Sequence, residues 1–242
     1  AELDLINQDP LKLRKQLVAK KELRDSSSSA FQKEKIQEQI SQLNKKARHK
    51  ATDARLVRAI YSSRQLQEVM VDFWFNHFNV FAGKKYINFW LRDYENEIRA
   101  NALGNFRDLL GATAKNPAML LYLDNDLNTA PNSPGAKGSF KGLNENYARE
   151  LMELHTLGID GGYTQDDIVT LARIFTGWGV DVKGQKGAEN GFFFNNNRHD
   201  QSEKIFLGHK ITANGIEEGK QALDILATQP ATAHFISYKL AQ

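Results

Sequence analysis

The 242-residue sequence predicts a mainly α-helical fold, a multi-helix single domain with one small β-hairpin. Apolar residues recur at helical spacing along most of the chain, and residues that commonly start helices, such as Asn, Thr and Pro, precede several of these segments. A convincing β pattern occurs in residues 192–211 alone. There Phe192–Phe194 and 204–211 are predicted to be two short strands joined by 195–203.

The first 55 residues are predicted to form a basic helical arm or N-terminal extension. Helical spacing extends from Leu3 to Arg24, and a long, mostly polar helix follows from Phe31 to Ala59. Residues 1–60 contain 14 Lys and Arg against 8 Asp and Glu, a balance of +6. A basic arm can bind nucleic acid or anionic lipid. No aromatic residues alternate with these lysines, so a solvated helix face is favoured and nucleic-acid binding is not expected.

Residues 56–242 are predicted to form the main helical domain. The loop residues of 124–140 form a long connection, and long ordered loops are often functional. The last helix has no stop signal and the first residue is Ala1, so we expect a fragment with a truncated C-terminus, from which a leader could have been removed. The expected helices are Gln65–Phe81, Phe89–Ala102, Asn105–Lys115, 117–123, one around 146–156, one capped by Thr164, Ile216–Ala227 and one opened by Pro230.

The composition narrows the classes of function. The sequence contains no Cys, which excludes disulfides and thiol chemistry. No apolar run approaches the roughly 20 residues that span a bilayer, so no membrane span is expected. The sequence also lacks a phosphate-binding glycine loop and the HExxH and GxSxG motifs, which disfavours nucleotide, zinc-protease and serine-hydrolase chemistry.

An acidic stripe on the helix around residue 150 is the first candidate site. Asn146, Glu150 and Glu153 fall within one stripe of a helical wheel, where the two carboxylates repel each other. A shared proton or a shared cation relieves such repulsion, and oxygen ligands suit Ca²⁺, Mg²⁺ or Mn²⁺. The alternative is a solvated acidic stripe that Arg149 and other basic groups neutralise.

Two histidine regions are further candidates. His77 lies on the apolar face of its predicted helix, beside Asn76. Its side chain could be a metal ligand, a catalytic base or a hydrogen-bonded histidine of the core. His199 and Asp200 form a His–Asp pair in the expected hairpin loop, either as a metal ligand, as a base with its orienting carboxylate, or as an exposed polar loop.

Four motifs resemble a bacterial family catalogued as domain of unknown function number eighteen hundred. They are FWFNHFNV at 73–80, LLYLDNDLN at 120–128, the combined NENYARELMELHTLG and YTQDDIVTLARIFTGW at 144–178, and HDQSEKIFLG at 199–208, with Gln201 where the family pattern has Gly. The resemblance covers most of residues 56–240, and the first 55 residues look like an insertion. It implies a mainly helical bacterial protein, often exported to the periplasm or the exterior, with a sulfatase-like companion protein.

The motifs gather Asn, His, Glu and Asp beyond what a fold alone requires, which suggests one common polar pocket. In it Glu150, Glu153, His77 and His199 are the expected catalytic residues, and Glu150, Glu153 and Asp200 are the expected ligands of a divalent cation. The side chains expected to position a substrate are those of Asn76, Asn125, Asn144, Asn146 and Arg149.

Two functions remain open. The first is a metal-assisted or acid/base hydrolase, which requires His77, Glu150 and His199 to lie together. The second is a non-catalytic partner or scaffold of a secreted or envelope complex, in which the polar motifs build a rigid hydrogen-bonded core and an apolar patch stays exposed.

Overall fold

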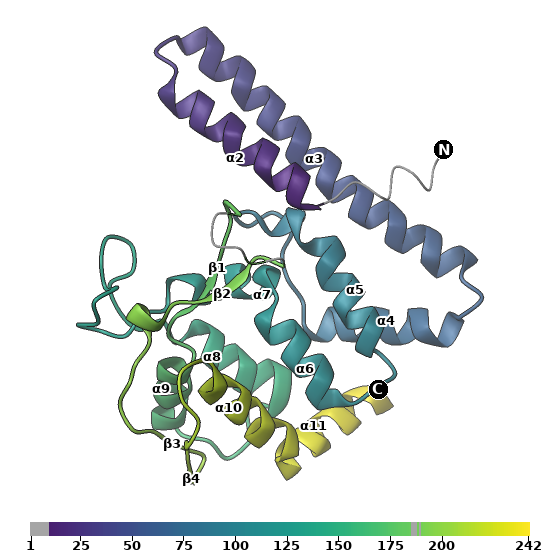
Figure 1. Cartoon of the computed structure of the whole chain (residues 1–242). Helices are drawn as coiled ribbons and strands as arrows, with labels where there is room; N and C mark the ends of the chain where they lie inside the picture. Colours follow the sequence, from purple (N-terminus) through teal and green to yellow (C-terminus); the bar gives the residue numbers. More distant parts are fainter. Residues whose placement is uncertain (1–9, 185–187, 189) are drawn as a thin grey trace.

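The computed structural model describes residues 10–184, 188 and 190–242, and these are mainly helical, which confirms the predicted fold class (Figure 1). A helical hairpin projects from a body in which the remaining helices pack around one hydrophobic core. Within the described residues, no helix has the length and apolar character that crossing a membrane requires.

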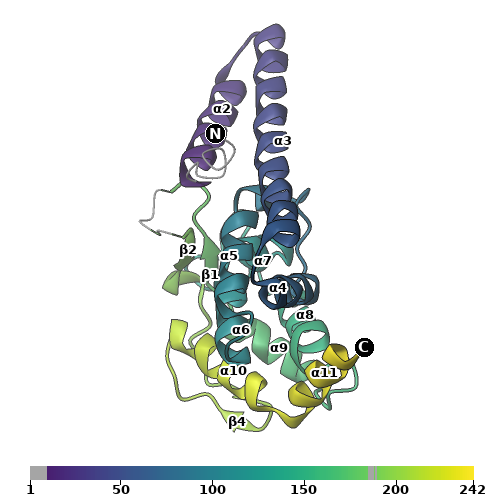
Figure 2. The ribbon, with the colours of Figure 1, turned by 90° about the vertical axis from the view of Figure 1, so that its right-hand side faces the viewer.

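The projecting hairpin consists of α2 (Pro10–Ser26) and α3 (Ala30–Tyr61), which lie antiparallel (Figures 1 and 2). The hairpin buries Leu17 and Ile40, and Lys20 Nζ donates a 2.6 Å hydrogen bond to Gln39 Oε1. Near the body the Arg14 guanidinium stacks 4.2 Å from the centre of the Trp90 ring. Because α3 passes through residue 55 without a break, the arm and the main domain share one helix.

The body helices start where the sequence places capping residues. Asn105 and Asn116 accept hydrogen bonds from the backbone of the helices that follow them, and Thr164 forms a capping box with Asp167. The elements are α4 (Gln65–His77), η1 (Ile87–Phe89), α5 (Leu91–Asn101), α6 (Phe106–Lys115), α7 (Pro117–Tyr122), η2 (Asn125–Leu127), α8 (Asn146–Glu150), η3 (Leu151–Thr156), α9 (Gln165–Ile174), η4 (Asn196–Arg198), α10 (Ile216–Thr228) and α11 (Pro230–Ala241).

The pairing of the predicted hairpin is wrong. Strand β2 (Phe192–Phe194) pairs with β1 (Trp178–Val180), a segment for which the sequence suggested no strand. Residues 204–211 instead fold back on themselves, and β3 (Ile205–Phe206) pairs with β4 (His209–Lys210). The turn between them holds Leu207 at φ 47° and Gly208 at φ 77°, a left-handed geometry that closes a two-residue hairpin and keeps this segment from reaching β2.

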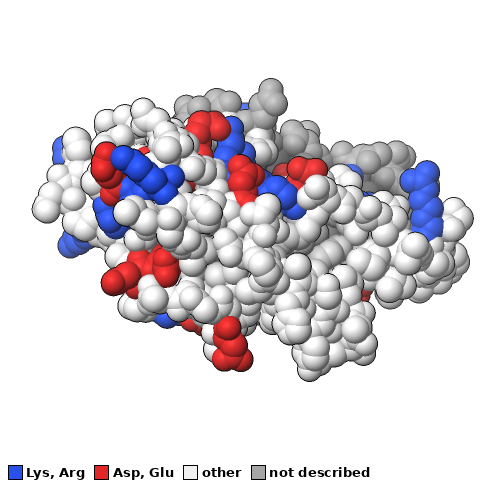
Figure 3. All heavy atoms as spheres, turned by 90° about the horizontal axis from the view of Figure 1, so that it is seen from below, with Lys and Arg blue, Asp and Glu red and all other residues white. Residues whose placement is uncertain are grey.

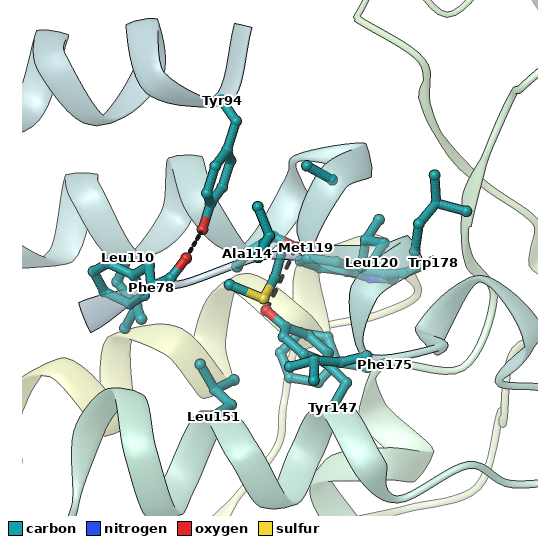
Figure 4. Close-up of a cluster of buried hydrophobic side chains, with 14 of the residues drawn as sticks. Phe78, Tyr94, Leu110, Ala114, Met119, Leu120, Tyr147, Leu151, Phe175 and Trp178 are labelled. Carbon is teal, nitrogen blue, oxygen red and sulfur yellow. Dashed lines mark hydrogen bonds between the residues drawn. The ribbon is translucent and has the colours of Figure 1, made fainter. Parts of the chain in front are cut away.

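Buried aromatic side chains fix the segments that carry the polar motifs (Figure 4). The Tyr94 hydroxyl donates a 2.7 Å hydrogen bond to the backbone carbonyl of Phe78, at the end of α4. The Tyr147 ring packs beside Phe175, with ring centroids 5.3 Å apart, and so ties α8 to α9. The end of α4 and the start of α8 are thereby held in place within the core.

Candidate functional site

A polar pocket of about 470 Å³ lies between α4, the end of α7, the α8–η3 helix and α11. Figure 2 shows α4, α8 and α11 close together on one side of the body. We call it the His77 pocket, and it is lined by Asn76, His77, Asn79, Tyr122, Leu123, Asn146, Glu150, Leu154, His155 and Lys239.

A change of helix type brings side chains into this pocket. The motif helix is α-helical to Glu150 and then becomes a π-helix over η3, so that Leu157 N–H bonds to the carbonyl of Met152, five residues back. The wider π turn rotates each residue by less than an α turn does, which returns His155 to the side of Glu150. Such π segments are frequent at functional sites.

His77 is held as a neutral imidazole with a defined tautomer. Its Nε2 lies 3.0 Å from the backbone carbonyl of His155, and because a carbonyl only accepts, Nε2 carries the proton. Its Nδ1 therefore carries the lone pair, which accepts a 3.4 Å hydrogen bond from Lys239 Nζ. Burial lowers the pKa of His77 to about 4. The hydrogen bond to the His155 carbonyl opposes this change, and the charge of Lys239 adds a smaller lowering.

His155 forms the inner wall of the pocket. Burial, with smaller contributions from His77 and Lys239, lowers its pKa to about 3. Its ring packs on Phe78, with centroids 5.2 Å apart. Both histidines of the pocket are therefore uncharged at neutral pH.

The two carboxylates of the acidic stripe have different surroundings. Glu150 lines the pocket, and burial together with the charge of Glu153 raises its pKa, although Arg149 opposes the change. Glu153 and Arg149 lie outside the pocket lining, joined by a 3.5 Å contact, and Arg149 also contacts Glu145 at 3.2 Å. Glu153 thus acts on the pocket through its charge.

The predicted asparagines divide between the pocket and the core. Asn76 and Asn146 line the pocket, where the Asn146 amide donates to the carbonyl of Leu123 at 3.2 Å. Asn125 is buried and its amide donates to the carbonyls of Phe175 and Trp178. The Asn144 amide donates to the carbonyl of Asp124, which has the uncommon φ of 60°. Asn125 and Asn144 therefore hold the 123–128 segment in place.

His199 belongs to a buried ionic network elsewhere. Its Nδ1 lies 2.9 Å from the carbonyl of Thr176, and its Nε2 lies 3.2 Å from Glu218 Oε1 on α10. Lys204 Nζ lies 2.8 Å from Glu218 Oε2. None of these residues lines the His77 pocket. The expected single pocket therefore divides into the His77 pocket and this His199 network.

Asp200 lies in the His199 network and does not join the expected cation ligands. Burial alone would raise its pKa, but hydrogen bonds from Arg173 and Ser202 hold the pKa of this carboxyl well below its usual range. Glu150 and Glu153 are consequently left without the third expected ligand. Within residues 10–184, 188 and 190–242, no group of three or more His, Asp or Glu is arranged to hold a metal ion.

Six lining residues lie outside the predicted site residues, namely Asn79, Tyr122, Leu123, Leu154, His155 and Lys239. Asn79 lies inside the FWFNHFNV motif, next to residues that the sequence did single out. Lys239 comes from the last helix, far along the chain and outside every motif, and no signal in the sequence points to it.

The fold and the pocket define a class, a mainly helical protein whose polar pocket contains neutral histidines, a carboxyl and an ammonium. The chain belongs to the family described as Protein of unknown function (DUF1800), whose model matches residues 4–242. The matched range extends beyond the residues 56–240 that carry the motif resemblance and includes the helical arm. Comparison with curated proteins and with solved structures found no match.

The neutral state of His77 predicts a pH-dependent stability. In the unfolded chain a histidine has a pKa near 6.5, whereas folded His77 has a pKa of about 4. Between about pH 6 and about pH 4.5 this side chain is therefore protonated in the unfolded state and neutral in the folded state. Folding is therefore weakened as pH falls, by about 1.4 kcal/mol per pH unit for this group. Urea unfolding across this range should give a shallower slope for His77→Gln than for the natural chain by about that amount. Equal slopes would contradict a neutral His77.

Proposed function

We propose that this protein is an acid/base hydrolase that acts at the His77 pocket, outside the cytoplasm. One observation carries the proposal. A neutral imidazole with the lone pair on Nδ1 and a carboxyl with a raised pKa line the same pocket. Two titratable groups with opposed tendencies are the arrangement that acid/base catalysis uses.

The reaction assigns one proton transfer to each group. His77 Nδ1 takes a proton from the attacking water, whose oxygen bonds to the electrophilic carbon of the substrate. Glu150 gives its proton to the leaving group as the bond to that carbon breaks. The proton on His77 then returns to Glu150 through water, which restores both groups. Asn76 and Asn146 position the substrate from the pocket wall.

The acid/base form is favoured over the metal-assisted form. Glu153 lies beside Arg149 at the surface, and Asp200 pairs with Arg173 at 2.9 Å. A cation at Glu150 would have to recruit ligands other than the two that the sequence suggested, whereas a raised pKa already relieves the repulsion between Glu150 and Glu153.

Glu150→Gln tests the proposal in a hydrolysis assay. A panel of chromogenic esters and glycosides, neutral and anionic, is offered to the natural chain and to the variant. We expect turnover by the natural chain, and a kcat lower by about 10²–10⁴ in the variant because the general acid is missing.

The control is Glu145→Gln, which changes a glutamate that precedes the same helix, pairs with Arg149 and does not line the pocket. This variant should keep the activity of the natural chain. No turnover of any panel member, or turnover that Glu150→Gln leaves unchanged, would contradict the proposed function.

A partner or scaffold role is the second candidate, because large apolar side chains are exposed where α3 meets α4. Leu66 on α4 is 67% exposed and Tyr61 on α3 is 79% exposed, and Leu56, Ile60 and Val69 are exposed near them in the sequence. Exposed apolar patches often mark protein interfaces. Joint elution with the sulfatase-like companion in size-exclusion chromatography, lost in Leu66→Asp, supports this role. Separate elution opposes it.

A further inference from the structure

Lys239 lines the pocket and has no counter-ion among the residues that the structure describes. Its Nζ contacts the neutral His77 ring at 3.4 Å and lies 5.0 Å from the centre of the Phe235 ring. Among the described residues no carboxylate lies within ion-pair distance of it, whereas the lysines Lys84, Lys85 and Lys204 all have such partners. A half-buried ammonium that contacts only neutral groups is poorly compensated and favours an anion from outside the chain.

The charge of the pocket limits the ligand to a single negative charge. Of the ten lining residues, Lys239 is the one cation, because both histidines are neutral, and Glu150 is the one carboxyl. Charged side chains are also sparse over much of the face on which α10 and α11 lie (Figure 3). A dianion would place two negative charges against a single ammonium, so a monoanion suits this site better.

The remaining polar groups of the pocket suit hydroxyl groups. Three side-chain amides, those of Asn76, Asn79 and Asn146, line it together with Tyr122. An amide both donates and accepts hydrogen bonds, as a hydroxyl group does. Each amide can therefore donate to a ligand hydroxyl or accept from it. The volume of about 470 Å³ lies within the range of small-molecule sites.

We propose that the His77 pocket binds a hydroxylated carboxylic acid of the size of one sugar-acid unit. Its carboxylate is held by Lys239, and its hydroxyls lie along the amides of Asn76, Asn79 and Asn146. The inference rests on the proposed function, since it names the substrate class of the same pocket. The charge-assisted bond to Lys239 gives the site its preference for an acid over the neutral sugar.

Calorimetric titration of the full chain with glucuronate and with glucose tests this assignment, because the two differ in the carboxylate. We expect glucuronate to bind roughly ten- to hundredfold more tightly than glucose, the range that a hydrogen bond to a charged group supports. Lys239→Met, which keeps most of the aliphatic stem, should reduce the glucuronate affinity to that of glucose. Lys239→Arg should restore much of the preference.

The control is Lys210→Met on β4, where the lysine is exposed and pairs with Glu203 outside the pocket. This variant should bind glucuronate as the natural chain does. Thermal unfolding of each variant identifies any loss of binding that comes from loss of folding. Failure of the natural chain to bind glucuronate, tighter binding of inorganic phosphate than of glucuronate, or unchanged binding by folded Lys239→Met would overturn the proposal.

Binding and turnover separate this inference from the proposed function. If glucuronate binding depends on Lys239 and no panel substrate is hydrolysed, the sugar-acid binding site is supported and the proposed hydrolase function is contradicted. If neutral substrates are hydrolysed in a way that depends on Glu150 and not on Lys239, the hydrolase function is supported and the sugar-acid binding site is contradicted.

Discussion

Glu218→Gln is expected to lower the free energy of unfolding by about 3–5 kcal/mol, because it removes the nearest carboxylate from the buried Lys204 ammonium. The Glu218 carboxylate lies between Lys204 Nζ at 2.8 Å and His199 Nε2 at 3.2 Å. The side chains of Lys204 and His199 are 1% and 0% exposed, so water cannot solvate them once the Glu218 carboxylate is lost. Urea unfolding of the natural chain and the variant at neutral pH measures the difference.

Glu217→Gln is the matched control for this change. Glu217 is the preceding residue of α10, is 53% exposed and pairs with the exposed Lys220. Such surface pairs contribute about 0–1 kcal/mol, so this variant should unfold almost as the natural chain does. A loss for Glu218→Gln no larger than that for Glu217→Gln would show that the network does not stabilise the fold.

His77→Gln is expected to lower kcat by about 10²–10⁴ while the chain remains folded. The glutamine amide can still donate to the carbonyl of His155, so the hydrogen bond that His77 makes through Nε2 has a replacement. An amide cannot take the proton that the proposed reaction assigns to Nδ1. Steady-state kinetics on a substrate that the natural chain hydrolyses, with circular dichroism to verify folding, measures the effect.

The control for the histidine is His209→Gln, at an exposed position on β4 away from the pocket lining. This variant should keep its kcat within a few-fold of the natural value. If His77→Gln retains the same kcat as His209→Gln, His77 is not the general base and the proposed reaction is wrong.

Local signals in the sequence were sufficient for most of the fold. Apolar periodicity predicted the helices, and Asn105, Asn116 and Thr164 marked starts that the structure confirms. Strand pairing failed because short strands carry little register information, and the turn at Leu207 has a left-handed residue that its sequence does not announce. A helical wheel assumes a uniform α-helix, so it could not show the π turn of η3 that brings His155 to the side of Glu150.

The candidate site was predictable only in part. His77, Glu150, Asn76 and Asn146 do meet in one pocket. His199 carries the same kind of motif signal and instead builds the buried network with Glu218, because polar residues that fix a core and polar residues that face a ligand look alike in one sequence. The helix that carries Lys239 reaches the pocket through tertiary packing, which no local pattern encodes.

The division between the His77 pocket and the His199 network is tested most directly by kcat per folded molecule, measured for His77→Gln and Glu218→Gln at a low temperature where both are folded. If the pocket is the active centre and the network supports the fold, Glu218→Gln keeps its kcat within a few-fold and His77→Gln loses about 10²–10⁴. The reverse pattern, an active His77→Gln and an inactive folded Glu218→Gln, would place the chemistry at His199 and contradict the proposed site.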